Sequence, residues 1–179
     1  MTADTGKTRF NIGDWIVHYY HGVGQVENIV IKGLDGNQKK YYKVSTKNID
    51  YWIPFEDEGS DHIEPIRPKS KFNTALKIVE MKPHAIANHH KSRKKKINDR
   101  WMIGSLKSRA ELLRDLHGRM KLQKLSFSEK EMFHKVRESF ISEWLISDEN
   151  LTRKQAGKRL RMALKTSATK GKKAMHIEK

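Results

Sequence analysis

Apolar and polar residues alternate between Phe10 and Pro54, and this period of two predicts a series of short strands. Aromatic and β-branched residues fill 40–44 and 49–53, which predicts two of these strands. The glycines within 33–37 predict a hairpin turn, since glycine readily adopts the positive φ angles of tight turns. Four to five strands in about 45 residues bury their apolar side chains best in a small, strongly bent antiparallel barrel of the SH3 or Tudor type.

Helical spacing of apolar residues replaces this alternation further along the chain. The positions from Phe72 to Val79 predict a helix that stops near Pro83. Three capping boxes, each followed by an apolar stripe, predict further helix starts. They begin at Ser108, Ser126 and Thr152. The sequence therefore predicts an α+β fold, with an antiparallel β-barrel domain in 1–66 and an all-α helical bundle domain in 67–165.

Three segments lack either pattern. An acidic stretch at 56–61 follows the last predicted strand. Residues 83–98 have almost no apolar side chains and include a basic run, so we expect a basic linker or exposed arm. Residues 166–179 are rich in lysine and small residues, and we expect a disordered tail.

Charge divides the chain at the boundary between the two predicted domains. The 179 residues carry a net charge of +16, but residues 1–66 contain seven basic and ten acidic side chains, a net of −3. The remaining 113 residues contain 30 basic and 11 acidic side chains, a net of +19. Because a strongly basic region concentrates at polyanions by steering and counterion release, we expect the helical domain to bind nucleic acid and the β domain to bind a protein.

Several classes of protein are disfavoured by composition and motif. The absence of cysteine excludes disulfides, thiolate catalysis and cysteine-based zinc sites. No apolar run long enough for a membrane span and no secretory signal is present, so we expect a soluble cytoplasmic, nucleoid-associated protein without membrane contact. No Ser-His-Asp order, P-loop or carboxylate pair stands out, so we expect no enzyme and no cofactor.

A group of histidines raises the question of a metal site. His84, His89 and His90 lie near Asp99 in the sequence, but adjacent histidines point in different directions on any regular element, and no second ligand cluster appears. We therefore expect no metal site, and a metal-dependent nuclease is the remote alternative.

The order of these features resembles a known family. The β part opens with Phe10-Asn11-Ile12-Gly13-Asp14 and continues with Ile16-Val17-His18-Tyr19-Tyr20-His21-Gly22-Val23-Gly24. The helical part contains Leu113-Arg114-Asp115-Leu116 and Leu125-Ser126-Phe127-Ser128-Glu129-Lys130. Together these segments resemble the CarD/CdnL transcription regulators, whose β module is shared with the polymerase-binding segment of the transcription-repair coupling factor.

The resemblance implies a bacterial accessory factor that binds the RNA polymerase β subunit through a Tudor-like module. Its helical domain would contact double-stranded promoter DNA at the upstream edge of the transcription bubble and so stabilise the open complex. We expect a monomer. The alternative is a sequence-nonspecific DNA-binding protein of the nucleoid type that does not contact polymerase.

For polymerase binding, Lys32 matches a commonly basic family position, whereas Trp52 occupies a position that is often arginine. Trp52 either packs against the barrel or contacts polymerase, and Tyr51 and Ile53 flank it on the same strand.

For DNA binding, the family carries a tryptophan wedge three residues before an arginine-aromatic pair. The pair is Arg100-Trp101 here, and Ile97 stands at the wedge position, where isoleucine can also enter between base steps. For Trp101 we favour a role as the core anchor of its helix, and direct contact with a base is the alternative. Arg100 and Lys130 match family positions near the DNA backbone, and we expect both at helix starts. The basic run adds candidate phosphate contacts, which are Lys91, Arg93, Lys94, Lys95 and Lys96.

Overall fold

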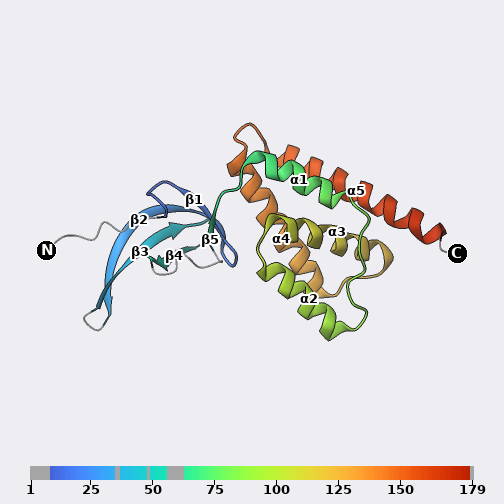
Figure 1. Ribbon diagram of the computed structural model, residues 1–179, viewed down its shortest axis with the longest axis horizontal. Helices are drawn as coiled ribbons and strands as arrows, with labels where there is room; N and C mark the ends of the chain where they lie inside the picture. Colours follow the sequence, from blue (N-terminus) through green and yellow to red (C-terminus); the bar gives the residue numbers. More distant parts are fainter. Residues whose placement is uncertain (1–8, 35–36, 48, 56–62, 178–179) are drawn as a thin grey trace. The chain divides into compact units, whose positions relative to one another are not determined.

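The structure is a computed structural model that describes residues 9–34, 37–47, 49–55 and 63–177. The chain divides into two compact units, residues 1–66 and 67–179 (Figure 1). The tip of the predicted hairpin at 35–36 and the acidic stretch at 56–61 lie outside the described residues.

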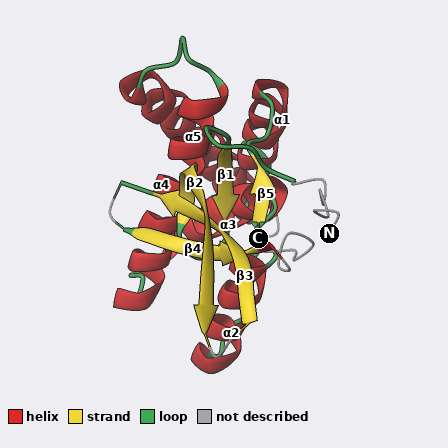
Figure 2. Cartoon of the chain, turned by 90° about the vertical axis from the view of Figure 1, so that its left-hand side faces the viewer, coloured by secondary structure: helices red, strands yellow, loops and turns green. Residues whose placement is uncertain are grey.

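The first unit is a five-stranded antiparallel sheet. Its strands are β1 (Trp15–His18), β2 (Gly22–Leu34), β3 (Asn37–Ser45), β4 (Asp50–Pro54) and β5 (Ile63–Pro65). They lie in the order β4-β3-β2-β1-β5, so the long strands β2 and β3 are central and β4 and β5 form the edges (Figure 2). β5 has only three residues, too few for an alternating pattern, and the sequence did not predict it.

Alternation along these strands produces one apolar face. Tyr42 and Val44 on β3 are buried together with Ile53 on β4, which pairs with Tyr42. Ile16 and Val26, from β1 and β2, complete the centre of this core. The intervening residues of β3 and β4 point to the other face, which leaves Lys43 and its pair partner Trp52 outside the core.

Two glycines explain the tight turn after β1. Gly22 has a φ of +79°, in the region that favours glycine. Gly24 lies so close to β3 that a Cβ atom would be 2.6 Å from Cγ1 of Val44. The Gly-x-Gly spacing therefore serves a turn and a close strand approach.

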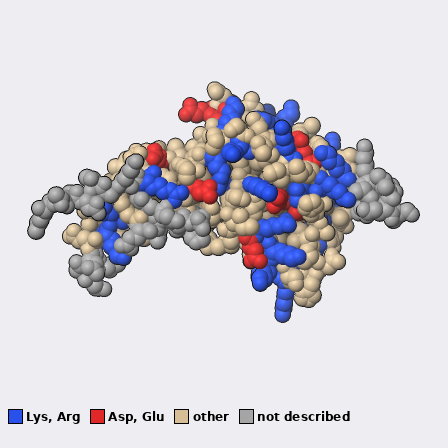
Figure 3. All heavy atoms as spheres, in the orientation of Figure 1, with Lys and Arg blue, Asp and Glu red and all other residues tan. Residues whose placement is uncertain are grey.

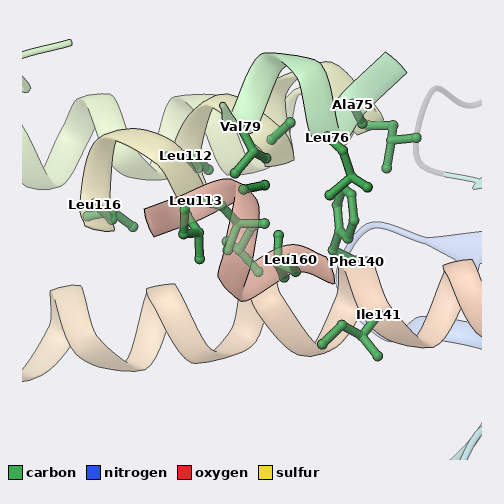
Figure 4. Packing of buried hydrophobic residues seen from close by; sticks show 14 of the residues in the cluster. Ala75, Leu76, Val79, Leu112, Leu113, Leu116, Phe140, Ile141 and Leu160 are labelled. Atoms are coloured by element: carbon green, nitrogen blue, oxygen red, sulfur yellow. The ribbon is translucent and has the colours of Figure 1, made fainter. Parts of the chain in front are cut away.

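The second unit is a bundle of helices around one apolar core. The described helices are α1 (Lys69–Val79), α2 (His90–Met102), α3 (Leu106–Leu122), α4 (Phe127–Ser147) and α5 (Arg153–Ile177). Side chains from all of them meet in the core, and Figure 4 shows the part formed by α1, α3, α4 and α5. The prediction of an antiparallel β unit followed by a helical unit is confirmed.

Helix starts follow the predicted capping boxes in two of three cases. At α4 the Ser126 hydroxyl accepts from the Glu129 N–H while the Glu129 carboxylate accepts from the Ser126 N–H. Thr152 and Gln155 make the same reciprocal pair before α5. The third prediction was wrong by one turn, because Ser105 caps α3 and Ser108 lies inside the helix.

The basic arm predicted at 83–98 is corrected by the structure. Residues 90–98 form most of α2. Arg93, Ile97 and Trp101 are spaced four residues apart, and all three are buried. The sequence does not show this buried stripe as an apolar pattern, because its first member is an arginine.

The disordered tail predicted at 166–179 is also corrected over 166–177, since α5 continues to Ile177, and residues 178–179 lie outside the described residues. Ser167 is fully buried and donates a hydrogen bond of 2.7 Å to the Met81 carbonyl. One turn further, Gly171 lies so close to Pro83 that a Cβ atom there would be 3.0 Å from the ring. Small residues let the helix continue along the segment after α1.

Candidate functional site

The exposed surface of α2 is basic, while its inner face holds the helix in the bundle. Lys91, Lys94, Lys95 and Lys96 are exposed. None of these four makes an ion pair within the described part of the chain. The structure thus presents four neighbouring ammonium groups on one anchored helix.

Arg93 belongs to the interior, which corrects its prediction as a phosphate contact. Its guanidinium pairs with the Glu129 carboxylate and donates to the carbonyls of Ala87 and Asn88, at 3.2 and 2.6 Å. A buried guanidinium needs several acceptors at once, and these three groups supply them. Arg93 therefore fastens the first turn of α2 to α4.

Ile97 and Trp101 are also interior residues. Ile97 is 3% exposed and Trp101 is 7% exposed, and both belong to the core of the helical unit. A wedge that enters DNA must stand free of the protein core, so the prediction of Ile97 as a wedge was wrong. Trp101 is the core anchor that the sequence favoured.

Arg100 lies in the last turn of α2, not at a helix start as predicted. Its Nη1 is 2.7 Å from Oδ2 of Asp115, and about a third of its side chain is exposed. The other carboxylate oxygen of Asp115 accepts from Arg114 and from the His84 N–H. Asp115 therefore holds the end of α2 and the segment before it, and only part of Arg100 remains available to a ligand.

Lys130 lies in the first turn of α4 and is exposed, as predicted for a helix start. Its own N–H donates to the Ser126 carbonyl, so only its side chain is available to an anion. The neighbouring Glu129 is buried, which by itself raises the pKa of its carboxyl. The Ser126 N–H, Arg93 and Arg119 outweigh this effect, and the pKa of Glu129 is lowered.

A groove of about 410 Å³ lies between α2 and α4. Lys94 and Ile97 of α2 line it on one side, and Met132 and Lys135 of α4 line it on the other. The Nζ atom of Lys135 is 5.0 Å from the centre of the Trp101 ring. Sequence reasoning missed Lys135, although helical spacing from the capping box of α4 places it one turn beyond Met132 on the same face.

The outer face of the β unit brings together two residues predicted from distant positions. Trp52 is 45% exposed, and the Nζ atom of Lys32 lies 3.5 Å from the centre of its ring. Lys43, the pair partner of Trp52, forms ion pairs with Glu27 and Asp50 at 2.8 and 3.3 Å. Trp52 is therefore a surface residue that contacts the ammonium group of Lys32 and neighbours Lys43, whose charge is paired.

Tyr51 and Ile53 point away from that surface. Ile53 is 4% exposed and its side chain lies in the core, so a polymerase contact at this position would use its backbone groups. Tyr51 is half-buried against the same core, its ring centre is 4.4 Å from that of His21, and burial raises the pKa of its hydroxyl. Their backbone groups remain on an edge strand, because β4 pairs only with β3 among the described strands.

The histidine group does not form a ligand set. In the residues that the structure describes, no three His, Cys, Asp or Glu side chains gather in a way that could hold a metal ion. Nδ1 of His84 is 3.1 Å from Nη2 of Arg114, and His89 stands directly before α2 without a capping hydrogen bond from its side chain. None of the described helices combines the length and apolarity that crossing a bilayer requires.

Comparison with known proteins identifies both units. The family model "CarD-like/TRCF RID domain" matches residues 10–57, and the model "CarD, C-terminal domain" matches residues 74–161. The chain is also similar to "Putative transcription factor YdeB" of Bacillus subtilis (strain 168), with 31% identity over 136 residues that cover 75% of this chain and 89% of that protein. The resemblance found in the sequence is thereby confirmed. The chain belongs to the CarD family of transcription regulators.

Proposed function

We propose that the protein binds the β subunit of RNA polymerase through the edge strand β4 and promoter DNA through α2 and the first turn of α4. DNA contact at the upstream edge of the bubble then stabilises the open complex. The observation that carries this proposal is the group of four exposed lysines on α2, held in place by the buried Arg93, Ile97 and Trp101.

The β4 edge suits an extended segment of a partner protein. An edge strand has backbone N–H and C=O groups free to pair with one more strand. Trp52 adds an exposed aromatic side chain beside this edge, and Lys32 lies against its ring. Tryptophan is among the residues that contribute most to protein interfaces, so we place the polymerase contact here.

The DNA contact is electrostatic. Lys91, Lys94, Lys95 and Lys96 are exposed on α2, and Lys130 is exposed on α4. Ammonium groups bind phosphates as point charges and do not read bases, so this surface supplies affinity and not sequence choice. Stabilisation of the open complex then requires that the protein bind the melted promoter more tightly than the closed one.

We propose that the protein works as a monomer in the cytoplasm, associated with the nucleoid. No cofactor is needed, because the protein acts by binding and breaks no bond.

Retention of the full-length protein on RNA polymerase β subunit tests the first contact. Trp52→Ala should weaken retention by at least tenfold, the effect expected for a central aromatic contact. Trp15→Ala is the matched control, because Trp15 is similarly exposed, at 39%, on β1 of the same unit. If both variants bind polymerase as the wild type does, β4 is not the docking strand.

The lifetime of open complexes on a linear promoter tests the second contact. Lys95→Gln/Lys96→Gln should retain polymerase binding and shorten the lifetime relative to the wild type. If the wild-type protein binds duplex DNA and is not retained by polymerase, the nucleoid-type alternative replaces this proposal.

A further inference from the structure

The long helix α5 carries far more positive charge than its own stability favours. Between Arg153 and Ile177 the sequence has nine Lys and Arg residues and no Asp or Glu. The first turn contains basic residues and no acidic one, which opposes the helix dipole. Like charges four residues apart also destabilise a helix. An anionic partner outside the helix would offset the repulsion between these charges.

Four of these charges form a straight stripe, which we call the α5 stripe: Lys154, Lys158, Arg161 and Lys165. At 100° per residue, these positions fall within about 60° of one another around the helix and span about 16 Å along it. All four side chains are exposed, and no ion pair joins them to any described residue. They form a row of available cations.

The stripe is fixed in direction by the opposite face of the helix. Ala156, Leu160, Ala163 and Leu164 are buried in the core of the unit. Ser167 continues this buried face with its hydrogen bond to the Met81 carbonyl. Because the packed face holds α5 over several turns, the stripe is presented as a rigid row and not as a flexible tail.

Within the helical unit, the α5 stripe and the basic surface of α2 belong to different sides. α2 packs on α3, and α3 also contacts α5, so α3 lies between them. Figures 1 and 2 agree in placing α5 and α2 at opposite ends of this unit. Lys and Arg side chains gather near both helices in Figure 3.

We propose that the α5 stripe is a second binding face for the phosphate backbone of duplex DNA. A straight duplex that lies along α2 cannot also follow α5. A duplex bound by the α5 stripe is therefore a second one, and the helical unit would hold two duplex segments at once. Lysine and arginine in a row of about 16 Å match the repeated phosphates of a backbone, and α5 has no acidic residue between Arg153 and Ile177 that would repel them. This face goes beyond the proposed open-complex function, which uses α2 and the first turn of α4.

A bridging experiment with the full-length protein tests this second face. One duplex is fixed to beads, a labelled duplex of the same length is added with protein, and captured label is measured at 0.15 M salt. Lys158→Gln/Arg161→Gln should lose bridging, since two phosphate contacts contribute about 30-fold in affinity at this salt concentration. The variant should still bind a single duplex through α2.

Two further variants make the result specific. Lys95→Gln/Lys96→Gln should keep single-duplex binding through α5, and combining both pairs of substitutions should abolish binding. Lys40→Gln/Lys47→Gln removes the same charge from exposed positions of the β unit and should bridge as the wild type does. Because these side chains are exposed, the Tm of each variant should equal or exceed that of the wild type.

The outcomes separate the two faces. If Lys158→Gln/Arg161→Gln bridges duplexes as well as the wild type, the proposal of a DNA-binding face on α5 is refuted. Bridging would then come from another source, such as two protein molecules that pair with each other. If Lys95→Gln/Lys96→Gln loses all DNA binding, α5 contributes nothing and the inference also fails. If the α2 variant binds and bridges as the wild type does, the α2 assignment of the proposed function fails instead.

Discussion

Replacement of Ile97 by alanine tests whether this side chain serves the core or the DNA interface. The residue is 3% exposed in the core of the helical unit, between Arg93 and Trp101 on the inner face of α2. We expect Ile97→Ala to reduce stability strongly and to leave the DNA affinity of the folded protein close to that of the wild type.

The magnitude follows from burial. Truncating a fully buried isoleucine to alanine costs about 2–5 kcal/mol, because the transfer energy of the lost methylenes adds to that of the cavity. Ile97→Val removes one methylene and costs about 0.5–1.5 kcal/mol. In a unit of about 110 residues, each kcal/mol lowers Tm by roughly 4 °C, so Ile97→Ala should lower Tm by about 8–20 °C and Ile97→Val by about 2–6 °C.

Circular dichroism gives Tm, and the anisotropy of a labelled duplex at low temperature gives DNA affinity. Lys96→Ala is the matched control, since Lys96 is the adjacent residue and is exposed. This control should change stability by less than about 0.5 kcal/mol and weaken DNA binding about fivefold at 0.15 M salt. An Ile97→Ala protein with unchanged Tm and weakened DNA binding would refute the core assignment and restore the wedge.

Three further predictions concern the helical unit. A Cβ atom on Gly118 would be 2.4 Å from Cβ of Pro83, so Gly118→Ala should lower Tm. A Cβ atom on Gly157 would have ordinary contact distances, so Gly157→Ala should raise stability by about 0.5–1 kcal/mol. Thermal unfolding measures both effects. Glu143→Gln removes the charged carboxylate that pairs with Arg67 and with the buried Arg109, and should cost about 3–5 kcal/mol in urea unfolding. Because the pKa of Glu129 is lowered in the folded state, its contribution is present above the ordinary carboxyl pKa near 4.5 and is lost as the pH falls through the lower folded pKa, so Glu129→Gln should flatten the acid side of a plot of Tm against pH.

The sequence predicted the elements that its own local pattern determines. Alternation gave β2, β3 and β4, and the reciprocal capping boxes at Ser126 and Thr152 gave two helix starts, because each signal lies within a few neighbouring residues. The start of α3 depends on more than local pattern. Ser108 satisfies the box motif, but its hydroxyl donates to the Arg100 carbonyl at 2.6 Å, and Ser105 becomes the cap.

The local sequence pattern does not predict α2, because the burial of its inner face depends on a residue far away in the sequence. Arg93 occupies the position where periodicity requires an apolar side chain, and it can be buried only because Glu129, 36 residues further along the chain, meets it there. Nothing in the local sequence of α2 reveals that pairing. The same reason explains why Arg93 and Ile97 were predicted as DNA contacts, while the lysines beside them stay candidates.

Arginine and lysine have different roles in the helical unit. Arginines at the interior bind carboxylates, as Arg93 does with Glu129 and Arg109 with Glu143, since a guanidinium can satisfy several acceptors in a fixed geometry. The free charge of the helical unit therefore rests mainly on exposed lysines. The buried arginines Arg93, Arg109 and Arg114 each pair with a buried carboxylate, so the excess positive charge of this unit lies at its surface.

This difference determines where specificity must arise in the proposed function. Lysines bind phosphates without reading sequence, so the helical unit alone has no means of choosing a promoter. Docking of β4 on polymerase would make the DNA contact intramolecular, and the effective local concentration would favour the DNA beside the polymerase over the excess of other DNA. Moderate, nonspecific affinity is then an advantage, because tight binding through α2 or α5 would hold the protein on DNA that carries no polymerase.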